Sequence, residues 1–369
     1  MCFHSVEEIV EELKQGHFVI LVDDEARENE GDLIIASDFV SPEAINFMSK
    51  FARGLICVSI TQAQAKKLSL PLMVRPEDNF SPHKTAFTVS VEAARGVSTG
   101  ISARDRAQTI QILCHPHSKP EDIISPGHIF PIKAQEGGVL KRAGHTEASV
   151  DFCKLAGLTP SAIICEIVNS DGTMARIKEL IDFSKKHKFK IGTIESLIQY
   201  RMAHDSLVEQ KAYAPFQTGL GKDWKLAVFY DSVNNKEHLV CIKGDISSEK
   251  TVLVRMQISC LTGDLFKDQL LPTGDYLRKS ISLINQEGSG VLVYLRMQNN
   301  LSKYVDYHKN KKNNSLFLKS DERDYGIGAQ ILRALGIKKI KLITNKASKK
   351  VGLKGYGLSI VENVSLDIK

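Results

Sequence analysis

The sequence predicts a soluble α+β protein built from two domains. Its 369 residues exceed what one ordinary hydrophobic core holds. The first part of the chain alternates short apolar runs with amphipathic stretches, which is typical of mixed strands and helices. This pattern breaks over residues 203–222, where Pro, Gly and polar residues accumulate. We therefore expect one domain over residues 1–205 and a second over residues 206–369.

The first domain is predicted to begin with a helix, because Ser5 and Glu8 have the spacing of a capping box. Val6, Ile9 and Leu13 supply its apolar stripe. Further helices are predicted at residues 42–52, 102–114, 146–157 and 174–187, the third of them starting at Thr146 and stopping at Gly157. Apolar runs predict strands at residues 18–22, 33–36, 55–60, 85–91, 129–134 and 161–168.

The second domain is predicted to begin with strands at residues 225–231, 237–244 and 251–259. A helix at 325–337, closed by Gly336, then precedes strands at 340–344 and 356–362.

Composition excludes several classes of protein. No apolar run reaches the ~18 residues that a membrane span needs, so no membrane role is expected. The seven cysteines form no CxxC pair, which disfavours a disulfide framework and suits a reducing cytoplasm. The net charge of +6 comes from scattered lysines and one basic loop at 308–314, which is weak support for nucleic-acid binding.

An acidic loop stands out between the first two predicted strands. DDEARENEGD, residues 23–32, holds six carboxylates in ten positions, and Gly31 is expected to permit a sharp turn. Such crowding is unfavourable unless solvent, a cation or a shifted pKa relieves it. A solvated turn and a site for a hard cation such as Mg²⁺ both fit this loop, since Mg²⁺ prefers oxygen ligands.

Three other segments carry groups suited to chemistry. RAGHTE places Arg142, His145 and Thr146 at a predicted helix start, where unpaired N–H groups favour phosphate. PGHIFP exposes His128 just before a strand. Glu166 lies within an apolar strand, where burial would raise its pKa unless alternation turns it to solvent.

Together, DDEARENEGD, GLICVSIT, TAFTVS, TGISARDR, PGHIFP, RAGHTEAS and CEIVNSDGTMAR resemble the 3,4-dihydroxy-2-butanone-4-phosphate synthases of riboflavin biosynthesis, in collinear order over residues 1–205. The resemblance implies a mixed α/β, sandwich-like synthase domain that acts as a homodimer with sites at the interface. It also implies conversion of ribulose 5-phosphate to formate and a four-carbon dihydroxybutanone phosphate, with Mg²⁺ or Mn²⁺ as cofactor.

Carried over by motif, Glu28 and His145 would be the metal ligands. His128, Glu166, Glu30 and Asp32 would supply acid–base groups, since enolisation, water loss and a skeleton shift require several proton transfers. The substrate-binding set would comprise Arg27, Glu28, Asp32, Arg142, Ala143, Gly144, His145, Thr146, Glu166, Cys57 and Thr99.

The second domain resembles GTP cyclohydrolase II, through RMQISCLTGDLF, NQEGSG, DERDYGIGAQILRALG and LITN. The family's three zinc cysteines are reduced to Cys260, because Leu271 and Thr273 stand at the other two positions. Ser289 replaces an arginine expected to face phosphates, while Asp321 and Arg323 match the acid–base and nucleophile positions. Since catalytic zinc generally needs three protein ligands, we expect neither zinc nor GTP hydrolysis here.

Two alternatives remain open on the sequence. The chain could be bifunctional and retain GTP cyclohydrolase II activity, or it could be a nucleotide- or RNA-binding regulator that uses its second domain. The intact synthase motifs favour the enzyme.

Overall fold

The computed structural model describes residues 3–25, 27–247, 250–296, 302–309, 322–344 and 358–366. The chain divides into two compact units, Met1–Arg201 and Met202–Lys369. Each unit is a mixed β-sheet with helices packed against it, so the predicted fold class is confirmed. No helix among these residues is long and apolar enough to cross a membrane.

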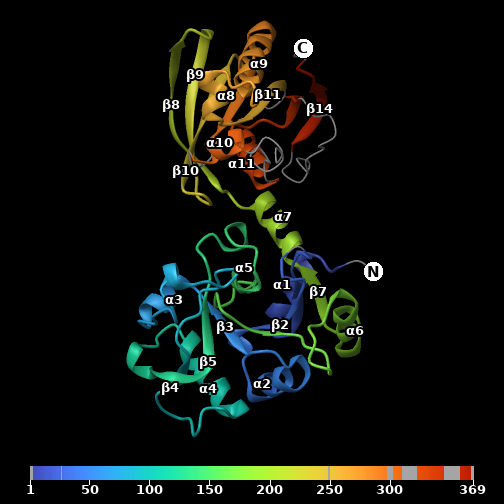
Figure 1. The fold of residues 1–369 in the computed structure, drawn as a ribbon. Helices are drawn as coiled ribbons and strands as arrows, with labels where there is room; N and C mark the ends of the chain where they lie inside the picture. The colour runs from blue at the N-terminus through green and yellow to red at the C-terminus, as the bar shows by residue number, and fades with distance from the viewer. Residues whose placement is uncertain are drawn as a thin grey trace. The chain divides into compact units, whose positions relative to one another are not determined.

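The sheet of the first unit mixes parallel and antiparallel pairs (Figure 1). Its described strands lie in the order β4–β5–β3–β6–β2–β1–β7. Their bounds are β1 Val19–Val22, β2 Gly31–Ala36, β3 Cys57–Ile60, β4 Val91–Ala93, β5 Ile123–Lys133, β6 Ala162–Glu166 and β7 Lys190–Thr193. Strands β1, β2 and β3 are buried along their whole length, as expected when both faces of a sheet are covered.

Helices form a layer on each face of this sheet. Their bounds are α1 Val6–Lys14, α2 Pro42–Phe47, α3 Gln62–Lys67, α4 Ala103–Cys114, α5 His145–Leu155, α6 Ile177–His187 and α7 Ile194–His204, with short turns at Ser37–Phe39, Met48–Ala52, Pro76–Asp78, Pro120–Asp122 and Gly138–Leu140. Leu21 and Ile34 face the core shared with α1 and α5. Ile20 and Leu33, one residue away, face the core shared with α2, α4 and α6, because side chains alternate along a strand.

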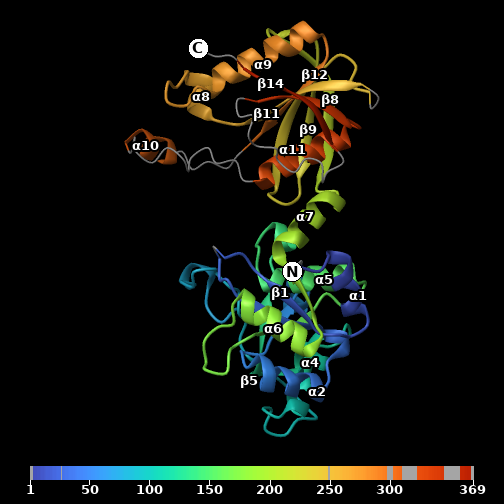
Figure 2. The ribbon, with the colours of Figure 1, turned by 90° about the vertical axis from the view of Figure 1, so that its right-hand side faces the viewer.

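The second unit has a sheet of its own (Figure 2). Its described strands lie in the order β14–β13–β11–β12–β10–β9–β8. Its elements are β8 Val208–Thr218, β9 Gly221–Asp231, β10 Lys236–Lys243, β11 Thr251–Ile258, α8 Leu261–Phe266, α9 Thr273–Glu287, β12 Gly290–Leu295, α10 Ser302–Lys309, α11 Glu322–Ala334, β13 Lys339–Ile343 and β14 Ser359–Val364. Helix α9 packs through Ile281 and Ile284 on Trp224 and Leu253. Gly328 of α11 lies close to Met256.

Residues 203–222, where the sequence shows no periodicity, contain β8, which pairs with β9. β8 is an edge strand with mostly exposed side chains, so it lacks apolar periodicity. Two local expectations need correction. Helix α5 is capped by Gly144 and begins at His145, not Thr146. Of the predicted strand at 85–91, only Phe87 and Thr88 form isolated bridges before β4 begins. The capping box of Ser5 and Glu8 is confirmed.

Candidate active site

The acidic loop between β1 and β2 is organised by Asp23, a residue outside the predicted site. One carboxylate oxygen of Asp23 accepts the backbone N–H of Glu30 at 2.8 Å. The other accepts the backbone N–H of Glu28 at 3.1 Å and Arg27 Nη1 at 2.8 Å. Arg27 Nη1 also lies 2.6 Å from Glu28 Oε2. Asp23 therefore fixes the direction in which the carboxylate of Glu28 leaves the loop.

The expected role of Gly31 as a sharp turn is wrong. The left-handed conformation belongs to Asn29, with φ +56°, whereas Gly31 already pairs with Val22 in the sheet. A Cβ on Gly31 would lie 2.6 Å from a methyl carbon of Leu180 in α6. Glycine is required here because the helix packs directly on the strand.

Glu28 and His145 meet although they are far apart in the sequence. Glu28 Oε2 lies 3.8 Å from His145 Nδ1, and Asp32 Oδ1 lies 3.9 Å from the same nitrogen. His145 is buried, and its Nε2 has no hydrogen-bond partner among the described residues. Ligand atoms of Asp23, Glu28 and His145 all lie within 4.8 Å of one another. A carboxylate–imidazole set of this kind suits a divalent cation.

The crowded charges shift the pKa values of this cluster in opposite directions. The nearby imidazole of His145, with support from Arg27, lowers the pKa of Glu28 to about 2. Burial of Asp32, together with the neighbouring Glu166, raises its pKa to about 7. Burial alone would lower the pKa of His145, but the carboxylates of Asp32 and Glu28 outweigh it and raise that pKa to about 9. Burial also raises the pKa of Glu30.

Glu166 lies beside this cluster at the same end of the sheet. It pairs with Asp32 across β6 and β2, and its Oε2 accepts the backbone N–H of Leu55 at 2.9 Å. A Cβ on Gly54 would lie 2.6 Å from that same oxygen, so glycine allows the loop before β3 to approach it. Cys57, at the start of β3, is buried, and burial raises the pKa of its thiol well above the ordinary value.

The segment from Arg142 to Thr146 leads into α5 and includes its first residues, His145 and Thr146. Arg142 donates to Glu147 Oε2 at 2.7 Å, to Thr85 Oγ1 at 2.8 Å and to the carbonyl oxygen of His83 at 3.2 Å. His83 Nε2 in turn lies 3.7 Å from Glu28 Oε1. Arg142 therefore ties the loop at residues 83–85 to the helix that carries His145.

The α5 N-terminus has no side-chain cap, because Gly144 is the N-cap residue. Ala143 is partly buried and precedes it, and Thr146 is buried in the first turn. The first-turn N–H groups of a helix attract anions, and more strongly where no side chain caps them.

His128 belongs to a second cluster. Its Nδ1 lies 2.7 Å from Glu92 Oε2, and no contact recorded for the described residues links it to Glu28 or His145. Thr99 is exposed next to Gly100, which packs against this pair. His128 still lies toward the same end of the sheet, because β5 pairs with β3 and β3 pairs with β6.

Sequence reasoning missed the partners that hold these groups. Asp23 lay within the quoted acidic loop but was not singled out, and Glu147 lay within the RAGHTE motif. Thr85 opens the TAFTVS motif but was not singled out, whereas His83 and Glu92 are outside the recognised motifs. A carboxylate within the short apolar strand β4 was the one signal for Glu92.

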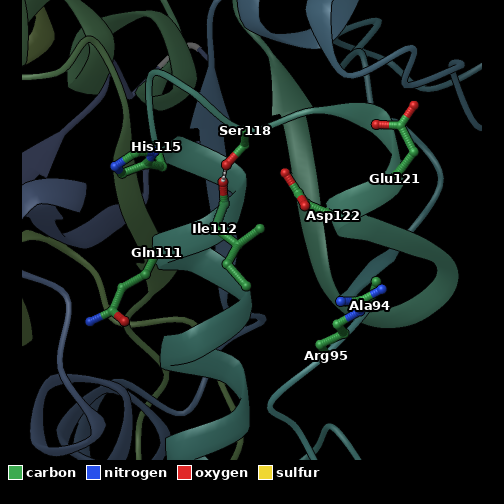
Figure 3. Close-up of a pocket in the computed structure, with 8 residues that line it drawn as sticks. All are labelled: Ala94, Arg95, Gln111, Ile112, His115, Ser118, Glu121 and Asp122. Carbon is green, nitrogen blue, oxygen red and sulfur yellow. Dashed lines mark hydrogen bonds between the residues drawn. The ribbon is translucent and has the colours of Figure 1, made fainter.

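A pocket of about 420 Å³ lies elsewhere in the first unit, between α4 and the segments after β4 and α4. In Figure 3, Ile112 and Asp122 face each other across it, whereas Gln111 and His115 are directed away from Asp122. Ser118 donates to the carbonyl oxygen of Ile112 at 2.6 Å. The pocket contains none of the predicted site residues.

The three positions at which the cyclohydrolase resemblance expects zinc cysteines lie in one region of the second unit and carry Cys260, Leu271 and Thr273. Cys260 and Leu271 are buried together with Tyr304. Gly263 packs against Thr273 Oγ1 and Cys260 Sγ. The described part of this unit contains no group of His, Cys, Asp or Glu side chains spaced to hold a metal ion. The cysteines that the structure describes are all free.

Several expectations lie partly or wholly outside the described residues. Asp321, most of the basic loop at 308–314 and the start of the segment 356–362 are among them, as is the side chain of Arg323.

The fold and the site define an enzyme domain that gathers carboxylates and an imidazole from several elements at one end of a mixed sheet. The protein-family model for 3,4-dihydroxy-2-butanone 4-phosphate synthase matches residues 7–200, and that for GTP cyclohydrolase II matches residues 209–365. The chain belongs to the 3,4-dihydroxy-2-butanone 4-phosphate synthase family, and its first unit is a synthase domain of riboflavin biosynthesis.

Relatives and solved structures agree with this assignment. The riboflavin biosynthesis protein RibBA of Aquifex aeolicus is 46% identical over 381 residues, which span 100% of this chain and 93% of that protein. A probable bifunctional riboflavin biosynthesis protein RIBA 2, chloroplastic, of rice is 46% identical over 99% of this chain and 68% of its own length.

Two solved structures are also similar. RibBX from A. baumannii, described as a two-domain 3,4-dihydroxy-2-butanone 4-phosphate synthase, has a TM-score of 0.78 and 38% identity, covering 99% of this chain and 100% of that one. A synthase solved in complex with two magnesium ions has a TM-score of 0.53 and 40% identity, covering 55% of this chain and 99% of its own.

Proposed function

We propose that the first unit converts ribulose 5-phosphate into 3,4-dihydroxy-2-butanone 4-phosphate and formate with a divalent cation held by Glu28 and His145. The observation that carries this proposal is the 3.8 Å separation of Glu28 Oε2 and His145 Nδ1. Two ligands each about 2.1 Å from one ion lie roughly 3–4 Å apart.

The donor set favours Mg²⁺ or Mn²⁺ over softer metals. Both prefer carboxylate oxygens and keep water or substrate oxygens as further ligands, so two protein ligands suffice. When bound, such an ion would stabilise negative charge that develops on the sugar oxygens.

The substrate phosphate is assigned to the start of α5. The uncapped helix N-terminus from Gly144 to Thr146 offers backbone N–H groups. Arg142 uses three of the five N–H groups of a guanidinium for Glu147, Thr85 and His83, so it can contribute the others. Arg27 and Asp32 would then contact the sugar, with Cys57 and Thr99 at the pocket edge.

The proton transfers are assigned to Glu30, Asp32, His128 and Glu166. Glu166 is held toward Asp32 by the Leu55 N–H, which supports a shared role. The side chain of His128 is 45% exposed. A homodimer with the site at its interface would bury this histidine and Thr99, and we propose that arrangement.

The second unit is proposed to lack zinc and GTP cyclohydrolase activity. Its support is the packed cluster of Cys260, Leu271 and Tyr304 where the family's thiolates would gather. Retained bifunctionality is the alternative, because relatives at 46% identity carry the name RibBA or the description bifunctional. Formate release from GTP by the full chain distinguishes the two.

The test of the main proposal is formate release from ribulose 5-phosphate by the full chain, with Mg²⁺ and after chelation. We expect release that depends on the ion and is lost in Glu28→Gln and in His145→Ala, with thermal unfolding unchanged in the first variant. Glu12→Gln, on α1, is the matched control and should keep wild-type turnover. Normal turnover in either ligand variant would disprove the metal assignment.

A further inference from the structure

Glu92 and His128, on the neighbouring strands β4 and β5, form a close pair in which the carboxylate is buried and the imidazole is exposed. The Nδ1–Oε2 distance is 2.7 Å, and the side chain of Glu92 is 9% exposed against 45% for His128. A carboxylate can only accept hydrogen bonds, so Nδ1 must carry the proton. The other ring nitrogen, Nε2, is then the one that can accept or deliver a proton at the surface of the unit.

Glu92 is itself held by a second hydrogen bond from the core. Its Oε1 accepts the hydroxyl of Thr109 at 3.0 Å, and Thr109 is fully buried in α4. The Thr109 oxygen accepts the backbone N–H of Ala93 at 3.1 Å. Since the hydroxyl has a single hydrogen, this arrangement directs it at Glu92. The carboxylate therefore has both oxygens fixed.

The backbone at Gly100 lies directly against the hydrogen bond between Glu92 and His128. Gly100 has φ +83°, a conformation that side chains rarely adopt. A Cβ at Gly100 would lie 1.9 Å from Glu92 Oε2 and 2.6 Å from His128 Nδ1. The loop that carries Thr99 thus closes over the hydrogen bond, which separates it from solvent.

We propose that Glu92 is a positioning residue for His128: it fixes the tautomer and the ring orientation so that Nε2 meets the reacting sugar. Carboxylates that orient a histidine in this way commonly decide whether the imidazole can act. This inference rests on the proposed function of His128 as an acid–base group. If the Glu92–His128 pair served stability alone, the imidazole would not need to be exposed while both oxygens of the carboxylate are held by hydrogen bonds.

The experiment compares Glu92→Gln, Thr109→Val and Thr109→Ser in the full chain, with steady-state formate release as the readout. We expect Glu92→Gln to lower kcat about 100-fold, within the range that a positioned acid–base group contributes, with KM within about twofold. Thr109→Val, which removes the hydroxyl, should also lower kcat. Thr109→Ser, which keeps the hydroxyl, should have a kcat near that of the wild type.

The matched control is Glu12→Gln, which alters a pair with the same atoms and distance. His17 Nδ1, just after α1, lies 2.7 Å from Oε2 of Glu12 in that helix. This variant should keep wild-type kcat and KM. Thermal unfolding of every variant shows whether a loss of kcat accompanies a loss of fold.

His128→Asn and the double variant His128→Asn, Glu92→Gln separate this inference from the proposed function. If Glu92 acts through His128, the second substitution causes no further loss of kcat. Full activity in His128→Asn overturns the proposed role of His128 itself. Loss in His128→Asn with normal kcat in Glu92→Gln, or an independent loss in the double variant, overturns the positioning role alone.

Discussion

Arg142 and Glu147 form a buried ion pair at the start of α5, and its removal tests how far the candidate site depends on it. The Nη1–Oε2 distance is 2.7 Å, and the side chains are 17% and 1% exposed. Arg142→Met removes the charge and leaves Glu147 with the backbone N–H of Gln135 as its partner. Breaking one side of a buried pair costs about 3–5 kcal/mol of unfolding free energy.

We expect the lower end of that range. Burial already raises the pKa of Glu147 with Arg142 in place, so the carboxyl group can take up a proton and limit the cost. A loss of about 3 kcal/mol lowers the melting temperature by about 6–12 °C for a domain of this size. The double variant Arg142→Met, Glu147→Leu should recover most of that loss, because two apolar side chains can replace a buried ion pair.

The assay combines calorimetry of the full chain with formate release. Both variants should lose turnover, since the phosphate would have lost the Arg142 guanidinium, while stability is lost mainly in the single variant. An unchanged melting temperature in Arg142→Met would refute the energetic reasoning, and normal KM and kcat in the double variant would refute the phosphate role.

Three further predictions concern other contacts. Asp151 on α5 forms a second buried ion pair, 2.7 Å from Arg201 Nη1, and Asp151→Asn weakens it. This variant should lower the melting temperature but leave kcat and KM at wild-type values. An altered kcat would show that strain in α5 reaches the site. Gly54→Ala should lower kcat by about tenfold or more, measured as formate release, because its Cβ would displace both the backbone and the carboxylate of Glu166. Metal analysis of the purified chain should find well below one zinc per chain, and one equivalent would show that Leu271 does not block the site.

Local features of the sequence predicted much of the fold. The capping box at Ser5 and the apolar runs of β1 and β6 depend on neighbours in the chain, so spacing alone reveals them. Strand β8 was not predicted, because an exposed edge strand has no buried face and therefore no alternation of apolar and polar residues. The start of α5 was misplaced by one residue, since Gly144 caps the helix and His145, not Thr146, begins it.

The sequence by itself determined that an acidic loop and a helix-borne histidine belong to one enzyme, because several motifs occur in collinear order. It could not decide which side chains hold them. Asp23 accepts hydrogen bonds within its own loop, and Glu92 accepts one from His128 on the next strand. Gly31 leaves space for the side chain of Leu180. These contacts join residues whose spacing carries no periodic signal, so only the packing of strands and helices decides them.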